Sequence, residues 1–428
     1  MLVMTGWAID AREGRAAEAG REAGATLERW IAMGLAYERG AGGVRRFDIA
    51  EVMNFAKGPA RHRGDPGYER FVRQARAFAL AFHPAGASAD APPRPDTLPP
   101  QRFTVTLLRE FAIPPTAPGS KLLFRLPMPI EDETLGDVLF DVIAPAGSSP
   151  DVAIAPGRLD VRLPAPDATS VVVGARWSFV CDPSRAARGG ERLDDDERDL
   201  YTRPAEGILK LTPRVAALAD EIAGAESEPF AVVRRFVDHL VDRLHLGIVH
   251  YDELDPAAPT DWVLDSGWFD CQMGSALVAA MCRAHGIPAR LVSGLQLTAA
   301  PAGHYWLEAW IDGRGWTPFD LNVCDLSARG RDAAWRDYYV GALDYRMKTQ
   351  VLPRTFSLTP SIRFPRSWHL LTSLTGEGAL STTRDDATGA LVYEDRVSVA
   401  RGDAPPGAFS VNATPSWPRT STGPGPKS

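Results

Sequence analysis

The sequence predicts an α+β protein in which a cysteine-bearing helix packs on an antiparallel sheet. Three observations lead to this class. Residues 8–82 and 205–246 are dominated by helical patterns. Residues 101–182 contain short strand signals separated by Pro and Gly turns, at the spacing of a β-sandwich. Residues 266–320 then contain a helix signal followed by strand signals.

Composition limits the classes of function. The 428 residues suggest about three domains and can bury a large core without disulfides or metals. Asp and Glu (54) exceed Lys and Arg (47), which gives a formal net charge of −7. This balance argues against a nucleic-acid partner and gives no reason to expect a membrane partner.

Targeting signals and cysteine usage point to one compartment. The N-terminus lacks the basic and apolar regions of a signal peptide, and no run of 18 uncharged apolar residues is present. Four cysteines in a chain of this length do not form a disulfide framework. We therefore expect a cytoplasmic protein.

The N-terminal part divides at a proline-rich segment. Residues 1–83 are expected to form a helical region without a catalytic motif. Residues 84–100 hold six prolines in seventeen positions and are predicted to be an extended linker. The β-rich domain is then expected over 101–200, where the acidic run 191–199 is interpreted as a solvated loop.

Helical signals return after residue 200. Thr212-Pro213 is typical of an N-cap followed by Pro at the first helical position. Residues 228–246 form an amphipathic pattern. Beyond residue 350 the patterns weaken, so we expect a C-terminal extension over 351–402 and a disordered tail over 403–428, which is rich in Pro, Gly, Ser and Thr.

Cys271 begins the most informative helix. An apolar face follows it at helical spacing, formed by Met273, Ala276, Leu277, Ala280 and Met281. Gly286 ends the helix, and Pro288 prevents its resumption. A thiol at a helix N-terminus faces the positive end of the helix dipole, so we expect a lowered pKa and a nucleophilic thiolate.

Two strands follow this helix and carry a histidine and an aspartate. His304–Ile311 alternates with period two, and Trp316–Asp320 returns after the turn Asp312–Gly315. The order of Cys271, His304 and Asp320 suits a triad in which the histidine accepts the thiol proton. The aspartate would then fix the tautomer of the histidine and stabilise its imidazolium.

The register of this hairpin decides whether His304 and Asp320 can meet. A two-residue turn would turn Asp320 away from His304, because opposed residue numbers would then sum to 627. A loop of three or five residues gives a sum of 626 and brings both side chains to one face. We therefore predict an odd loop across Asp312–Arg314, or a bulge, with a hydrogen bond between the Asp320 carboxylate and the His304 ring.

Three linked motifs resemble the transglutaminase-like superfamily of papain-like cysteine enzymes, in particular its bacterial members. They are the Cys271 helix with Gly286-Ile-Pro-Ala-Arg290, the strand His304-Tyr-Trp-Leu-Glu-Ala-Trp310, and Gly315-Trp-Thr-Pro-Phe-Asp320. The sequence departs from many members at Tyr305 and at Leu321-Asn322. The resemblance implies a papain-like transglutaminase core over 201–350, with Cys271 as nucleophile, His304 as general base and acid, and Asp320 as orienting carboxylate.

Three functions remain open at this point. The first is a cysteine-dependent hydrolase that cleaves amide or peptide bonds of a peptide or protein substrate through a thioacyl intermediate. The second is a protein-glutamine acyltransferase, and the third is a non-catalytic scaffold that keeps the fold. No metal or other cofactor is expected.

Several roles around the site also stay open. Glu308 either lines the cleft or pairs with an arginine. The second oxyanion donor is left between Trp268, Gln272 and a residue near Tyr251. Cys282 and Cys324 are interpreted as core residues. The sequence leaves the substrate and the oligomeric state undetermined.

Overall fold

The computed structural model describes residues 16–402, with gaps. The gaps are residues 48, 85, 114, 118, 156, 187–191, 250, 252–253, 256, 299–300, 353–377 and 385–387. The predicted tail, much of the C-terminal extension and the first 15 residues therefore lie outside the described residues. In the described part, no helix has the length and apolar character needed to cross a membrane.

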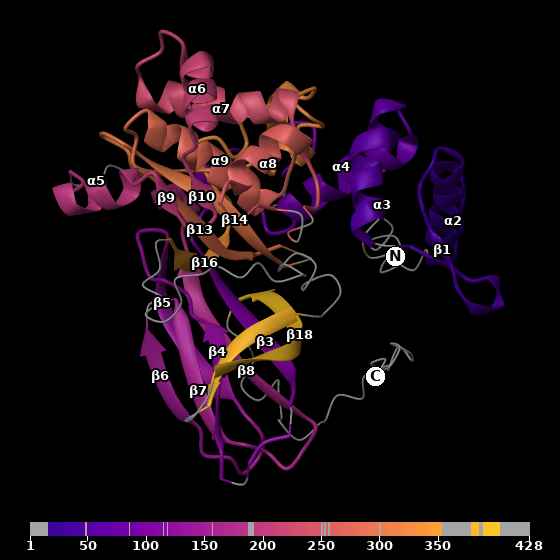
Figure 1. Ribbon diagram of the computed structural model, residues 1–428, viewed down its shortest axis with the longest axis vertical. Coiled ribbons are helices and arrows are strands. Elements are labelled where there is room, and N and C mark those ends of the chain that lie inside the picture. Colours follow the sequence, from indigo (N-terminus) through magenta and orange to yellow (C-terminus); the bar gives the residue numbers. More distant parts are fainter. Residues whose placement is uncertain are drawn as a thin grey trace.

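The N-terminal region lies to one side of the molecule (Figure 1). Its helices are α2 (Ala16–Ala32), α3 (Ile49–Phe55) and α4 (Pro66–Ala79), with a π-helical turn, η3 (Ala56–Ala60), after α3. A short hairpin of β1 (Glu38–Arg39) and β2 (Arg45–Arg46) interrupts the predicted helical region. Gly42 and Gly43 make this reversal possible with φ values of 70° and 78°.

The predicted linker packs against its neighbours. It contains a 3-10 turn, η4 (Pro95–Thr97), in which Pro95 is buried, and Leu98 is buried directly after it. The carbonyl of Pro99 accepts a hydrogen bond from the hydroxyl of Tyr345, 2.8 Å away. The segment is therefore fixed at the boundary between the β-rich region and the core.

Eight antiparallel strands form the lower part of the molecule in Figure 1. In chain order they are β3 (Gln101–Ala112), β4 (Lys121–Pro127), β5 (Leu135–Ile143), β6 (Asp151–Ala155), β7 (Arg158–Pro164), β8 (Ser170–Cys181), β17 (Gly378–Arg384) and β18 (Thr388–Arg401). Their order in the sheet is β5-β8-β3-β18-β17-β4-β7-β6. Strands from both halves of the sheet bury a common core around Phe103, Phe124 and Trp177, which makes the region sandwich-like.

The upper part packs helices on a four-stranded sheet (Figure 1). The helices are α6 (Pro213–Ala223), α7 (Pro229–Arg243), α8 (Pro259–Ser266) and α9 (Cys271–Ala284). The strands are β13 (Ala289–Gln296), β14 (Ala302–Ile311), β15 (Gly315–Phe319) and β16 (Arg346–Val351). Their order in the sheet is β15-β14-β13-β16. Two short helices, α10 (Val323–Leu326) and α11 (Ala333–Arg336), connect β15 to β16. This arrangement confirms the predicted α+β class.

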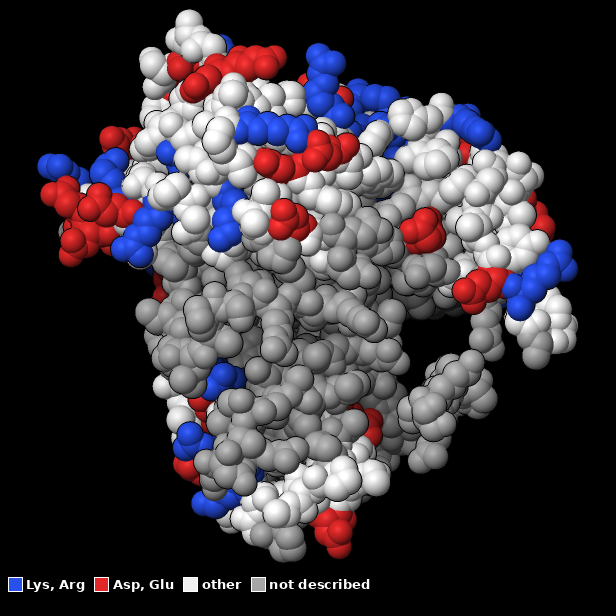
Figure 2. All heavy atoms as spheres, in the orientation of Figure 1, with Lys and Arg blue, Asp and Glu red and all other residues white. Residues whose placement is uncertain are grey.

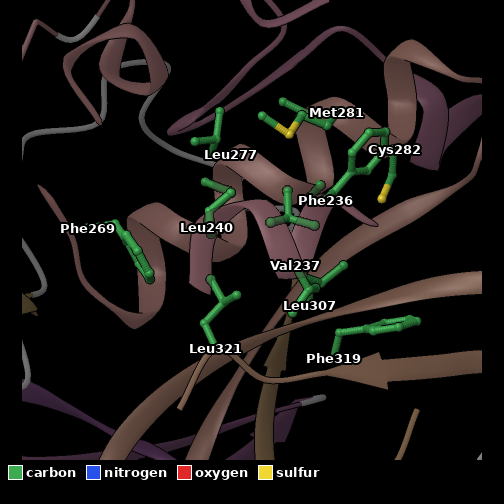
Figure 3. Close-up of a cluster of buried hydrophobic side chains, with 14 of the residues drawn as sticks. Phe236, Val237, Leu240, Phe269, Leu277, Met281, Cys282, Leu307, Phe319 and Leu321 are labelled. Carbon is green, nitrogen blue, oxygen red and sulfur yellow. The ribbon is translucent and has the colours of Figure 1, made fainter. Parts of the chain in front are cut away.

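Helix α9 lies at the centre of this part. Its residues from Cys271 to Arg283 are all buried, so the helix is enclosed on every side and not only on the predicted apolar face. Figure 3 shows Leu277 of α9 among side chains of α7 and of the sheet. Gly274 permits this packing, because a Cβ at its position would lie 2.4 Å from the Phe269 ring. The predicted C-terminal stop is confirmed at Gly286, with φ of 67°.

One predicted loop is a helix. The acidic run contains α5 (Asp195–Thr202), so the expectation of a solvated loop is wrong there. The side chain of Asp194 accepts a hydrogen bond from the amide of Glu197, and three acidic residues occupy the first turn. Negative charge is favourable at this end of a helix because of the helix dipole, which explains why an acidic run folds here.

Charged side chains of both signs lie next to one another on the visible face of the helical part (Figure 2). One mixed cluster is made by Arg234, Arg336 and the carboxylates of Asp238, Asp242 and Asp337. Surface pairs of this kind contribute little to stability individually.

Candidate active site

The hairpin of β14 and β15 has the predicted register. Leu307 pairs with Phe319 and Ile311 pairs with Gly315, so opposed residue numbers sum to 626 across a three-residue loop. Gly313 and Gly315 adopt positive φ values of 77° and 76°, which the tight loop requires. Asp320 directly follows β15 and lies on the same face of the hairpin as His304.

His304 and Asp320 are in direct contact. The His304 Nε2 lies 2.9 Å from both carboxylate oxygens of Asp320, which confirms the predicted hydrogen bond. Asp320 is fully buried, and its Oδ1 also accepts the backbone N–H of Asn322 at 2.9 Å. An ionised carboxylate at Nε2 favours the tautomer with the proton on that nitrogen, which leaves Nδ1 as the second ring nitrogen.

Sequence reasoning missed a cation beside Asp320. Arg346, the first residue of β16, places its Nη2 3.0 Å from Asp320 Oδ2. Asp344 in turn accepts a hydrogen bond from Arg346 Nε at 2.7 Å. Burial alone would raise the pKa of Asp320, but His304 and Arg346 outweigh burial and lower that pKa. Asp320 is therefore held as a carboxylate.

Cys271 and His304 line one cavity. Its volume is about 360 Å³, and the strand end Gln296 and the loop residue Asn322 also border it. Asp270 caps the helix by accepting the amides of Gln272 and Met273 at 3.0 and 2.8 Å. A backbone hydrogen bond from Tyr305 reaches the Cys271 thiol. The structure thus brings all three predicted site residues to one region of the fold.

The pKa of Cys271 contradicts the sequence-based expectation. Burial, followed by the negative charge of Asp270, raises the pKa of the thiol well above its ordinary value. The helix N-terminus was expected to lower it. Because Cys271 is only 5% exposed, loss of hydration dominates, so the folded site holds a neutral thiol until a base accepts its proton.

Two of the candidate oxyanion donors have other contacts. The Tyr251 hydroxyl lies 3.0 Å from Asp270 Oδ1 and 3.2 Å from Gln272 Oε1, so the Gln272 carbonyl is an acceptor within this cluster. The Trp268 ring packs against the ring of His245. Burial raises the pKa of Asp270 to about 6 despite the hydrogen bonds that the carboxylate accepts.

Glu308 pairs with cations away from Cys271. Its carboxylate lies 2.6 Å from Arg290 Nη2 and 2.9 Å from Lys348 Nζ. It borders a second cavity, of about 580 Å³, together with Trp306. Of the two roles left open for Glu308, the structure therefore shows the pairing with an arginine. Cys282 and Cys324 are buried in the core, as predicted.

A candidate metal centre is not formed by the residues that the structure describes. Among them, no group of three or more His, Cys, Asp or Glu side chains is placed to hold an ion.

A thiol at the start of a buried helix and a histidine–aspartate pair on the adjacent hairpin are the groups that a papain-like cysteine site combines. Residues 216–321 match the family profile described as the transglutaminase-like superfamily. This segment is therefore a domain of the transglutaminase-like superfamily, and it contains Cys271, His304 and Asp320.

The similar proteins match to different extents. A protein-glutamine gamma-glutamyltransferase of Pseudomonas aeruginosa is 35% identical over 124 residues, which cover 25% of this chain and only 18% of that protein. A provisionally assigned cysteine protease from Cytophaga hutchinsonii has a TM-score of 0.44 and 15% identity, covering 73% of this chain and 96% of that one. The periplasmic domain of TgpA from Pseudomonas aeruginosa has a TM-score of 0.27 and 17% identity, covering 58% and 94%.

Proposed function

We propose that the protein is an enzyme, a cysteine-dependent hydrolase that cleaves amide or peptide bonds through a thioacyl intermediate. One observation carries this proposal: His304 Nε2 lies 2.9 Å from both oxygens of the buried Asp320, while His304 and Cys271 line the same cavity. This is the arrangement that a thiol with a raised pKa needs, because a base oriented by a carboxylate can accept its proton.

The reaction proceeds in two steps. His304 accepts the Cys271 proton, and the sulfur attacks the carbonyl carbon of the amide. The tetrahedral intermediate collapses, and the departing amine takes the proton from the imidazolium, which leaves a thioester. Water then attacks the thioester while His304 accepts its proton, and the carboxylic acid and the free thiol are released.

Cys271→Ala tests the proposal. The variant should lose all cleavage of a protein substrate such as fluorescent casein that the wild type cleaves. Its unfolding free energy should fall by no more than about 1 kcal/mol, because a single sulfur is removed. Cys282→Ala is the matched control, because this thiol is fully buried in the same helix and should be dispensable for activity. Full cleavage by Cys271→Ala would contradict the assignment.

Acyl transfer to an amine is the second candidate. The similarity to a protein-glutamine gamma-glutamyltransferase favours it, although the matched segment is short. In this case an amine, and not water, resolves the thioester. Incorporation of dansylcadaverine into casein, measured beside peptide release, separates the two reactions: predominant incorporation would replace hydrolysis as the proposed activity.

A cytoplasmic location is part of the proposal. All four cysteines are buried free thiols, which is the state that a reducing compartment maintains. Periplasmic TgpA provides the alternative. Fractionation of the native host with compartment markers would decide between them, and recovery with periplasmic markers would overturn the cytoplasmic assignment.

A further inference from the structure

The N-terminal helices are fixed to the core beside the active site. The Asn54 side chain forms two hydrogen bonds with the backbone of Ile248, at 2.7 and 3.0 Å. Lys57 Nζ lies 2.8 Å from Asp325 Oδ2, and both side chains are largely buried. Arg76 donates to the carbonyl of Leu326 at 2.8 Å. Such buried polar contacts are costly to separate, so this region is a permanent part of the site.

One face of α4 borders the cavity that contains Cys271 and His304. The bordering positions follow helical spacing and are Phe71, Gln74, Ala75, Phe78 and Ala79. Met53 and Lys57, four residues apart, border the same cavity from α3 and η3. Most of these side chains are apolar. One wall of this cavity is therefore a mostly apolar surface supplied by residues 53–79.

Gln74 is the exception on this surface. It is only 8% exposed, and its Nε2 has no hydrogen-bond partner in the described structure. A buried amide donor without a partner destabilises the protein by about 1–3 kcal/mol, so a ligand acceptor at this position would remove an existing deficit. Amide carbonyls of peptides are acceptors of this kind.

We propose that α4 is the specificity wall of the active site, with Gln74 donating a hydrogen bond to a substrate carbonyl and Phe71 and Phe78 contacting an apolar side chain. This inference rests on the proposed function. The acyl carbon must reach the Cys271 sulfur, and the proposal assigns the substituent on that carbon to the wall. The substrate class is therefore a peptide with an apolar residue on the acyl side of the scissile amide.

Two alkylating reagents test the wall in the full-length protein. Benzyloxycarbonyl-phenylalanine chloromethyl ketone offers a carbonyl and an aromatic side chain, and the sulfur displaces its chloride. Methyl methanethiosulfonate offers neither group. Second-order rate constants at Cys271, measured by mass spectrometry of the modified peptide, give the ratio between the two reagents for each variant.

Gln74→Leu should lower this ratio about five- to tenfold, which is the effect of one lost hydrogen bond. Gln74→Glu has nearly the same shape but lacks the donor, so it should lower the ratio as well. This variant provides the test if the leucine variant fails to fold. A third reagent, benzyloxycarbonyl-glycine chloromethyl ketone, lacks the aromatic side chain. Phe78→Ala should reduce the ratio of the rate constant for the phenylalanine reagent to that for this glycine reagent. Arg73→Leu is the matched control, because this side chain on α4 is exposed and faces away from the cavity.

The outcomes separate the two proposals. If the folded Gln74 and Phe78 variants show unchanged ratios while Cys271 is still modified, the inference that α4 sets specificity is wrong. The assignment of Cys271 as nucleophile would then still stand. Absence of modification at Cys271 by either reagent in the wild type would overturn the proposed function, and the wall inference with it.

Discussion

Arg346 and Asp320 form a fully buried ion pair, with Nη2 3.0 Å from Oδ2, on the carboxylate that also contacts His304. The arginine is itself anchored by Asp344, which also accepts the hydroxyl of Tyr339. The carboxylate next to the histidine therefore has two cationic or potentially cationic neighbours, and its position depends on a strand that follows it in the chain.

Replacement of Arg346 should shift the pH dependence of the proposed reaction. In Arg346→Met, Asp320 loses one of the groups that lower its pKa, so the acidic limb of the activity profile should move to higher pH. The free energy of unfolding should fall by about 3–5 kcal/mol, because two buried carboxylates lose their partner. Arg214→Met is the control: its exposed pair with Asp265 should contribute less than about 1 kcal/mol. An unchanged profile would mean that Arg346 serves stability alone.

His304→Ala should abolish activity and raise the pKa of Cys271 further. The reason is that no imidazole remains to accept the proton and to stabilise the thiolate as an ion pair. The pH dependence of thiol alkylation, followed at Cys271, measures the shift. His239→Ala on α7 provides a histidine control outside the cavity. Identical alkylation profiles for wild type and His304→Ala would refute the pairing of Cys271 with His304.

Asp270→Asn should activate the thiol. The asparagine carbonyl can still accept the amides of Gln272 and Met273, so the helix cap is kept, while the charge that raises the pKa of Cys271 is removed. Alkylation of Cys271 at pH 7 should therefore be faster than in the wild type. The difference should disappear below about pH 6, where Asp270 itself becomes neutral.

Asp270→Ala separates capping from charge. It removes the charge and the cap together and should cost about 1–2 kcal/mol of stability, whereas Asp270→Asn should stay close to the wild type. Equal alkylation rates for wild type and Asp270→Asn above pH 6 would show that the carboxylate has no influence on the thiol.

Glu308 should make the protein acid-sensitive. Burial would raise the pKa of Glu308, but Lys348 and Arg290 outweigh burial and lower the pKa to about 2. Because the folded-state pKa lies below the unfolded value of about 4.5, this stabilisation is complete above pH 4.5 and is lost as the pH falls towards 2. The shift corresponds to about 3 kcal/mol.

Urea unfolding between pH 7 and 2.5 measures this contribution. Glu308→Gln should be less stable than the wild type at pH 7 and should lose less stability on acidification. Exposed Glu221→Gln on α6 should follow the wild-type curve. A wild-type curve with the same acid dependence as Glu308→Gln would refute the role of this carboxylate.

Local patterns and the expected pairing of two side chains were sufficient to predict the contact between His304 and Asp320. The period-two alternation of the two adjacent strands can be counted along the sequence, whereas the odd loop was inferred because only that parity brings Asp320 to the face of His304. The start of α9 at Cys271 and its end before Gly286 also follow from local signals.

The features that the sequence did not predict depend on tertiary packing. The raised pKa of Cys271 results mainly from burial, which the position of a thiol on a helix does not reveal. Gln74 reaches the cavity because α4 packs against α10, and the hydrogen bond between Arg76 and Leu326 that joins these helices spans 250 residues of sequence. Strand β18 pairs with β3 from an even more distant part of the chain, so local patterns could not identify its partner.

Strand β16 also carries the contacts between the two halves of the molecule. The Cys181 thiol donates to the carbonyl of Arg346, the amide of Ile130 donates to the carbonyl of Lys348, and Lys348 Nζ pairs with Asp132. The strand that supports Asp320 is thus anchored in the β-rich half. Loosening of that half would withdraw Arg346 from Asp320, so the proposed chemistry in the helical half depends on the integrity of the β-rich half.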